Sequence, residues 1–232
     1  MRCKIADLLV EVPAAGGMDQ RCGAYITDAT QPADITITES EYKPGPIAQL
    51  GYDDGCYMES SRQFYWALPQ FDGLMLHAAA VEYDGRAYLF SGPSTVGKST
   101  HTRLWKQLLG DGVNFINDDK PALRRMDGKW FAYGTPWCGK DGINQNKKVP
   151  LAGICFLKQG LENRICRLSE KEAMIRILSQ STKKIPDPLV MAQLLSHVDT
   201  LVREIPVYEL ENTPTEAAAK LSYETMSAGF PE

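Results

Sequence analysis

The alternation of hydrophobic and polar positions predicts a chain in which short strands and amphipathic helices follow one another. Strands are expected at residues 74–83, 86–91, 113–117, 121–126, 129–133, 151–157, 164–168 and 207–210. Helices are expected at residues 59–68, 98–109, 170–181, 187–202 and 216–226. Short apolar runs bounded by turn residues, interspersed with 3.6-residue periodicity, are typical of an α/β fold.

The N-terminal part of the chain follows a different pattern. Residues 4–12 read as one strand, and residues 35–38 alternate as a half-exposed strand does. A turn is expected at residues 43–46 (Lys-Pro-Gly-Pro). We therefore expect a small β-rich subdomain over residues 1–69, with a role in substrate recognition as its functional alternative, and a main domain over residues 70–232.

A two-residue hairpin turn is expected at Asp84-Gly85. It makes the strand at 86–91 antiparallel to the strand before it, so the sheet should be mixed. Counting back from the turn places His77 opposite Gly92. A lone strand histidine is more often a structural residue, but this register favours a functional one.

The segment Gly92-Pro93-Ser94-Thr95-Val96-Gly97-Lys98-Ser99-Thr100 matches the phosphate-binding pattern G-x-x-x-x-G-K-[ST]. Its glycines allow backbone turns in which consecutive N–H groups point at phosphate oxygens, and the following helix adds the positive end of its dipole. The lysine would contact the β- and γ-phosphates and Ser99 would contact Mg²⁺. A chance turn between a strand and a helix is the alternative. The strand expected before the segment and the helix expected after it favour nucleotide binding.

Two adjacent carboxylates, Asp118 and Asp119, follow the strand at 113–117. One can hold Mg²⁺ while the other accepts a proton from an attacking hydroxyl, and the residues alone leave their order open. The alternative is an aspartate pair that only shapes a turn. Beyond them, residues 134–142 form a long loop in which Lys140 is a candidate to stabilise a transferring phosphoryl group.

Other polar residues are interpreted as structural. Lys147 and Lys148 are expected on a solvated surface, Cys138 lacks a neighbouring base, and His197 lies on a mixed helix face.

Composition excludes several classes of protein. The net charge is −4, and no basic cluster is longer than two residues, which argues against a nucleic-acid binder. The six cysteines have no zinc-site spacing and are expected to be free thiols in a reducing cytoplasm. No signal peptide and no membrane-spanning run is recognised.

His77, the phosphate loop and Asn117-Asp118-Asp119 together resemble the HPr kinase/phosphorylase family and its shorter relatives. The catalytic core of that family is similar to ATP-dependent phosphoenolpyruvate carboxykinase. The resemblance covers about residues 74–157, with a weaker C-terminal match. The region from Gly134 to Lys140 resembles the shorter HPr kinase-like proteins found beside peptide-modification genes.

The resemblance implies a P-loop kinase core with a mixed, partly antiparallel sheet flanked by helices. It implies ATP and Mg²⁺ as cofactors, Asp118 as the base, Asp119 as an aid to the metal, and His77 near the transferred phosphate. Relatives form oligomers, so a homo-oligomer is among the expectations.

The function expected from the sequence is a kinase that phosphorylates a hydroxyl, with serine favoured, on a peptide, a protein or a small molecule. The alternatives are a nucleotide-binding regulator without turnover and a phosphoenolpyruvate carboxykinase-type activity.

Overall fold

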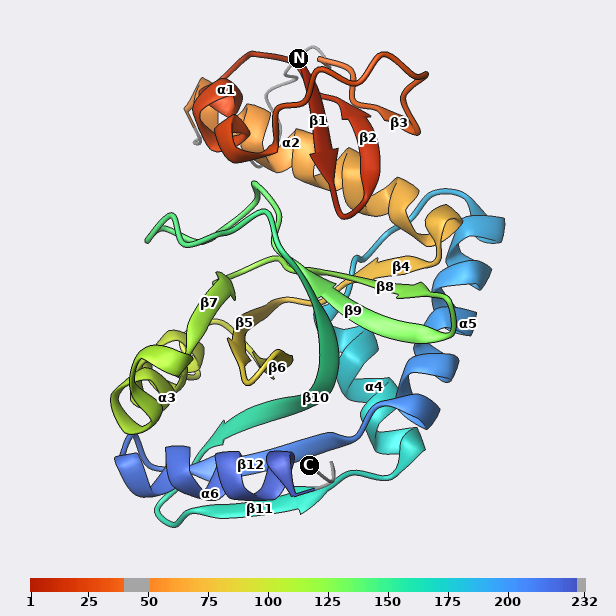
Figure 1. The fold of residues 1–232 in the computed structure, drawn as a ribbon. Coiled ribbons are helices and arrows are strands. Elements are labelled where there is room, and N and C mark those ends of the chain that lie inside the picture. The colour runs from red at the N-terminus through yellow and green to blue at the C-terminus, as the bar shows by residue number, and fades with distance from the viewer. Residues whose placement is uncertain (40–50, 229–232) are drawn as a thin grey trace.

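A mixed sheet of nine strands curls through the described residues and carries helices on both faces (Figure 1). The structure is a computed structural model and describes residues 1–39 and 51–228. A small three-stranded sheet from the N-terminal part lies beside the large one. The architecture is therefore α/β, with a mixed, curled sheet flanked by helices and a small N-terminal sheet.

The element boundaries are as follows. The strands are β1 (Arg2–Ile5), β2 (Leu8–Glu11), β3 (Ile35–Thr36), β4 (Gly73–Met75), β5 (Ala78–Tyr83), β6 (Arg86–Ser91), β7 (Asn114–Asn117), β8 (Ala122–Met126), β9 (Lys129–Tyr133), β10 (Lys148–Gln159), β11 (Arg164–Arg167) and β12 (Val207–Asn212). The α-helices are α1 (Met18–Arg21), α2 (Tyr52–Ala67), α3 (Lys98–Leu109), α4 (Glu170–Gln180), α5 (Pro188–Glu204) and α6 (Glu216–Ser227).

Strand β10 is the long element about which the sheet curls. Its first residues pair antiparallel with β9, and its later residues pair parallel with β6 and with β12. The strand order runs β4-β8-β9-β10-β6-β5-β7, with β12 also on β10 and β11 on β12. The strand β5 is antiparallel to both β6 and β7, so the predicted mixed sheet is confirmed.

Strand β6 is buried on both faces, because helices cover both sides of this part of the sheet. Ala87 and Leu89 belong to a core that includes residues of α4 and α5. Tyr88 and Phe90 belong to a second core that includes residues of α3 and α6. The continuous apolar run of β6 is the pattern expected for such a strand.

A third core joins the N-terminal residues to the main sheet. It contains side chains of β1, β2 and α2 together with Tyr133 and Trp137. Phe64 of α2 stacks on Trp137 with 4.7 Å between the ring centroids. In Figure 1, α2 lies between the N-terminal sheet and β4 and β8. The N-terminal part therefore packs on the loop that follows β9.

Several sequence expectations are confirmed residue by residue. The bounds of β6 and α3 match the prediction, and the hairpin at Asp84-Gly85 has Tyr83 opposite Arg86. The strands expected at 121–126 and 129–133 pair with each other, with Met126 opposite Lys129.

Other expectations are wrong in instructive ways. Residues 4–12 form a hairpin, because Ala6 and Asp7 both adopt positive φ and reverse the chain. The strand expected over 74–83 is divided, because β4 pairs with β8 whereas β5 pairs with β6 and β7. The helix expected at 59–68 begins earlier, at Tyr52, and the strand expected at 151–157 is longer.

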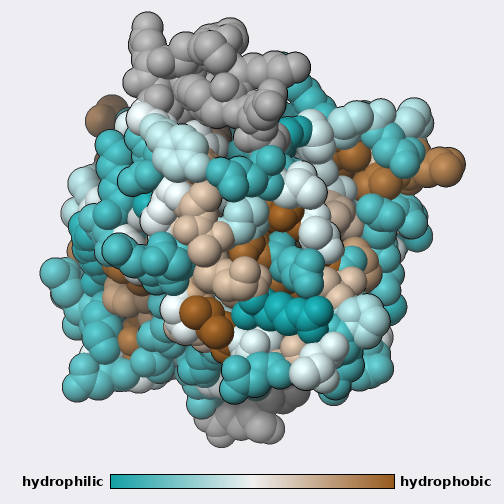
Figure 2. Space-filling view, turned by 90° about the horizontal axis from the view of Figure 1, so that it is seen from above, coloured by the Kyte–Doolittle hydropathy of each residue, from teal (hydrophilic) through white to brown (hydrophobic). Residues whose placement is uncertain are grey.

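The face seen in Figure 2 is mainly hydrophilic, with scattered hydrophobic residues. Among the helices of the described ranges, none combines the length and apolar character needed to cross a membrane. The turn expected at residues 43–46 lies outside the described residues.

The closure of the loop after β9 depends on Gly134. A Cβ at this position would lie 1.8 Å from the Gln145 carbonyl oxygen and 2.8 Å from that of Ile116. Gly134→Ala should therefore lower the free energy of unfolding by about 1–3 kcal/mol, measured by urea denaturation. Gly23→Ala is the control, because a Cβ there meets no atom within 4 Å. Equal stability of the two variants would contradict this packing.

His101 of α3 should make stability depend on pH. It is 1% exposed, its Nε2 lies 2.9 Å from Ser222 Oγ, and burial lowers its pKa to about 4. The unfolded chain binds this proton from about pH 6.5 downward. Stability should therefore fall as the pH drops from 6.5 toward 4, by about 1.4 kcal/mol per unit.

The measurement compares urea unfolding of the wild type and His101→Gln at pH 7.0, 5.5 and 4.5. The variant should lack this part of the pH dependence, since glutamine does not titrate. Identical pH slopes for both proteins would show that His101 is not the responsible group.

Candidate active site

The glycine-rich segment forms the connection from β6 into α3, as its pattern predicts. Gly92 has φ 142° and Gly97 has φ 107°, so both use the region that disfavours side chains. A Cβ on Gly92 would also lie 3.0 Å from Val96 Cγ1 and 3.2 Å from the Leu157 carbonyl oxygen. The backbone therefore requires glycine at both motif positions.

The N-terminus of α3 is left open to an anion. Gly97 occupies its N-cap without a side-chain hydrogen bond, and the first turn contains no acidic residue. By contrast, Ser169 caps α4 and Asp187 caps α5 with their side chains. The free N–H groups and the helix dipole of α3 favour a negatively charged ligand.

Lys98 is buried beneath this loop and lacks a carboxylate partner among the described contacts. Its Nζ donates to the carbonyl oxygens of Gly92, at 3.1 Å, and Pro93, at 3.3 Å. Burial lowers the pKa of Lys98, and the negative charge of Asp119 partly offsets this effect. The lysine is thus close enough to Asp119 for their charges to interact.

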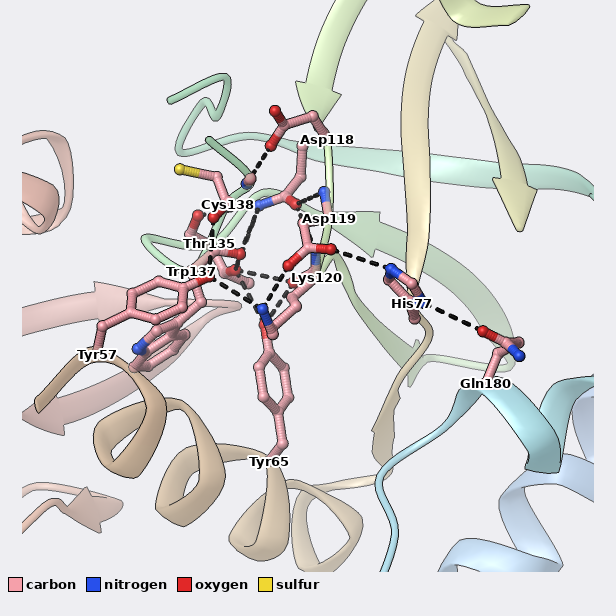
Figure 3. Close-up of polar contacts among 12 residues, drawn as sticks. Tyr57, Tyr65, His77, Asp118, Asp119, Lys120, Thr135, Trp137, Cys138 and Gln180 are labelled. Carbon is pink, nitrogen blue, oxygen red and sulfur yellow. Dashed lines mark hydrogen bonds and ion pairs between the residues drawn. The ribbon is translucent and has the colours of Figure 1, made fainter. Parts of the chain in front are cut away.

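His77 lies between β4 and β5, beside the start of the loop. Its carbonyl oxygen accepts a hydrogen bond of 2.8 Å from Ser91 Oγ, and its N–H donates to the Gln180 carbonyl. The ring bridges Gln180 Oε1 and Asp119 Oδ1, each at 3.1 Å (Figure 3). The end of α4 and Asp119 therefore fix the imidazole from its two sides.

Asp119 is held by two basic residues. One oxygen contacts His77, and the other accepts a hydrogen bond from the ammonium of Lys120. Burial opposes ionisation of this carboxyl, but the hydrogen bond from His77 and the charge of Lys120 outweigh it. The pKa of Asp119 is consequently lowered to about 2, so the group is a carboxylate at neutral pH.

Asp118 points away from Asp119, toward the loop after β9 (Figure 3). Its Oδ1 accepts a hydrogen bond from the Gly139 N–H, and a Cβ on Gly139 would lie 2.9 Å from Oδ2. Burial raises the pKa of Asp118, and the charge of Asp119 adds to this, against the effect of the Gly139 N–H. The two neighbouring carboxyls thus have different environments.

Asn117 organises the turn that separates them, and sequence reasoning assigned it no separate role. It is 1% exposed, and its Oδ1 accepts from the backbone N–H groups of Asp119, at 2.9 Å, and Lys120, at 2.8 Å. Its Nδ2 donates to the Thr135 carbonyl at 3.0 Å. An asparagine at a strand end is a recognised turn signal, so this role was accessible from the sequence.

Lys120 and two tyrosines are further site residues that the sequence did not reveal. Tyr57 Oη accepts from Lys120 Nζ at 3.0 Å, and Tyr65 Oη donates to the Lys120 carbonyl. Both tyrosines come from α2, more than fifty residues earlier in the chain. No local pattern could have linked them to Lys120.

The remaining candidates lie outside this group. Lys140 is exposed, and among the described residues it has no ion pair that joins it to His77 or Asp119. Lys147 pairs with Glu82 and Lys148 with Asp7, in keeping with a surface role.

Cys138 and His197, which were interpreted as structural, both make polar contacts within the fold. Cys138 is buried and its Sγ accepts from Asn144, and His197 Nε2 lies 2.8 Å from the Pro69 carbonyl oxygen. The six cysteines are all free.

These contacts bring together an anion-accepting loop, a lysine, the Asp119 carboxylate and a histidine at one end of β5, β6 and β7, whereas the carboxyl of Asp118 faces the loop after β9. Such an arrangement can hold a phosphate and offers carboxylate oxygens to a hard cation. Among the described residues no cluster of three or more His, Cys, Asp or Glu side chains has the geometry of a metal site.

Comparison with solved structures finds the HPr(Ser) kinase/phosphatase from Coxiella burnetii, with 14% identity and a TM-score of 0.36. The match covers 67% of this chain and 88% of that one. No curated protein matches. A family model described as SynChlorMet cassette protein ScmC matches residues 57–215, which is more than half of the chain. The chain therefore belongs to the ScmC family.

Proposed function

We propose that this protein is an ATP- and Mg²⁺-dependent kinase that transfers a phosphoryl group to a hydroxyl, with serine as the favoured acceptor. The observation that carries the proposal is the His77–Asp119 pair beside an uncapped helix start, whose buried Lys98 is affected by the charge of Asp119. A chance glycine-rich turn would not need a lysine buried beneath it or a carboxylate whose charge acts on that lysine.

The residues present fit a bound nucleotide. Among the described residues the ammonium of Lys98 has two carbonyl partners, and both are neutral loop groups that a phosphate oxygen would outcompete. Ser99 follows on the same helix start, half-buried, and Asp119 stays ionised. Ser99 and Asp119 are therefore the residues that would hold Mg²⁺.

Each group has a role in the proposed reaction. MgATP, when bound, supplies the phosphoryl group and neutralises its charge. Lys98 and the N–H groups of residues 92–100 hold the phosphate oxygens. Asp118 takes the proton of the acceptor hydroxyl, and its raised pKa supports the role of base over that of a permanent anion.

His77 and Lys140 would act on the transferring group. His77 is already held beside the loop by Ser91 and Gln180. Lys140 lies on the loop whose Gly139 contacts Asp118, so it would approach the acceptor side.

Lys98→Ala should weaken binding of a fluorescent ATP analogue in the presence of Mg²⁺ at least tenfold, since a charge-assisted hydrogen bond contributes about 1.5–3 kcal/mol. Lys106→Ala on the same helix is the control, because Lys106 pairs with the exposed Asp111. Titration by fluorescence anisotropy measures both variants. Equal affinity of the Lys98 variant and the wild type would remove the basis of the proposal.

Asp118→Asn should lower phosphoryl transfer by a factor of about 10²–10⁴, because the amide cannot accept the acceptor's proton. Nucleotide affinity should be largely unchanged. Radiolabelled ATP is incubated with free serine, inositol and peptides encoded nearby, and mass spectrometry identifies the product. Asp111→Asn is the matched control on an exposed aspartate. Transfer by Asp118→Asn at near the wild-type rate would show that another group is the base.

A further inference from the structure

Tyr57 links the two carboxyl-bearing sides of the candidate site through one hydroxyl. Lys120 Nζ donates to Tyr57 Oη at 3.0 Å, and Tyr57 Oη donates to the Cys138 carbonyl oxygen at 2.8 Å. The directions are fixed, because an ammonium only donates and a carbonyl only accepts. Both hydrogen bonds of the Tyr57 hydroxyl are thus made to residues of the site.

Each side of this link continues to a carboxylate. On one side, the ammonium of Lys120 contacts Asp119. On the other side, the residue after Cys138 is Gly139, whose N–H donates to Asp118 Oδ1. A continuous path therefore runs from Asp119 through Lys120, Tyr57 and residues 138–139 to Asp118, although the two aspartates point apart (Figure 3).

The ring of Tyr57 is itself held in place. The Arg21 guanidinium carbon lies 4.5 Å from the ring centroid, and Lys120 Nζ lies 5.0 Å from it. Cations over an aromatic face are attracted by its quadrupole. Burial raises the pKa of Tyr57 against the opposing charge of Lys120, so the hydroxyl keeps its proton at neutral pH.

We propose that Tyr57 is a positioning residue that sets the placement of Asp118 relative to Asp119 in the phosphoryl-transfer site. This inference rests on the proposed function. In that reaction the acceptor O–H bond breaks and its proton passes to Asp118. The acceptor oxygen bonds to phosphorus as the bond from phosphorus to the leaving ADP oxygen breaks.

Since small displacements of catalytic groups cost large factors in rate, loss of this link should appear in turnover rather than in binding. Tyr57 belongs to α2, which packs in one core with β1 and β2, so this N-terminal part of the chain contributes a residue to the site.

The test removes the hydroxyl and keeps the ring. Tyr57→Phe should lower kcat for ATP turnover about tenfold or more, with free serine as the acceptor probe and Mg²⁺ present. The KM for ATP and the affinity for the fluorescent ATP analogue should stay within about twofold of the wild type. The expected tenfold loss in kcat is about the net contribution of one hydrogen bond.

Tyr25→Phe is the matched control. Tyr25 is buried where Tyr57 is half-buried, also comes from the N-terminal part, and donates to Asn144 Oδ1 on the same loop at 2.8 Å. Its hydroxyl has no contact with either aspartate or with Lys120 among the described hydrogen bonds. This variant should keep the wild-type kcat.

A double-mutant cycle provides a second readout. Lys120→Met should lower kcat, and the double variant with Tyr57→Phe should lose less than the product of the two factors, because both act along one path. A loss in kcat of the double variant equal to the product of the two single losses would contradict the path.

The outcomes separate this inference from the proposed function. A Tyr57→Phe kcat equal to the wild type, or an equal loss in Tyr25→Phe, would overturn the positioning role while leaving a kinase. A wild type that neither binds the analogue nor turns over ATP would overturn both.

Discussion

The buried side-chain amide of Asn117 is the interaction on which the candidate site depends. A buried amide must satisfy its hydrogen bonds within the protein, since leaving them unpaired costs about 1–3 kcal/mol each. Asn117 does so by accepting from two backbone N–H groups ahead of it and by donating to Thr135 across the turn. The chain after β7 is thereby forced into a turn in which Asp118 and Asp119 face different neighbours. One carboxyl reaches His77 and Lys120, and the other reaches Gly139.

The N-terminal part contributes to the site through packing as well as through hydrogen bonds. Trp137 is fully buried against Phe64 and donates from Nε1 to Ser60 Oγ at 3.1 Å. Tyr65 Oη lies 3.0 Å from Thr135 Oγ1, and Tyr57 reaches Cys138. The loop that presents Gly139 to Asp118 is therefore shaped from two directions, by β7 beneath it and by α2 beside it. In the proposed reaction, the nucleotide and the acceptor would meet between elements that lie far apart in the sequence.

The sequence predicted the local features of the fold and the course of the glycine-rich loop. The bounds of β6 and α3 followed from an apolar run, a glycine motif and an amphipathic period, which are all short-range signals. The register of the Asp84-Gly85 hairpin correctly placed His77 at the loop, since Ala78 pairs with Ser91 and Ser91 Oγ bonds the His77 carbonyl. The sequence did not single out Lys120, because nothing local distinguishes a half-buried lysine from an exposed one.

What the sequence could not predict depends on contacts between distant residues. The interruption between β4 and β5 follows from pairing with different strands, and α4 supplies Gln180 from a hundred residues away. The same holds for Tyr57, whose hydrogen bonds to Lys120 and Cys138 exist only once α2 packs on the loop. Long-range pairing of this kind leaves no periodic signal in the chain.

The most direct test is a crystal structure with a non-hydrolysable ATP analogue and Mg²⁺. The account predicts that the triphosphate lies along residues 92–100, with Lys98 Nζ moved from the Gly92 and Pro93 carbonyls to phosphate oxygens. Asp119 should then contact the metal directly or through one water. An analogue bound elsewhere, or a Lys98 that keeps its carbonyl contacts beside a distant Asp119, would contradict the assignment.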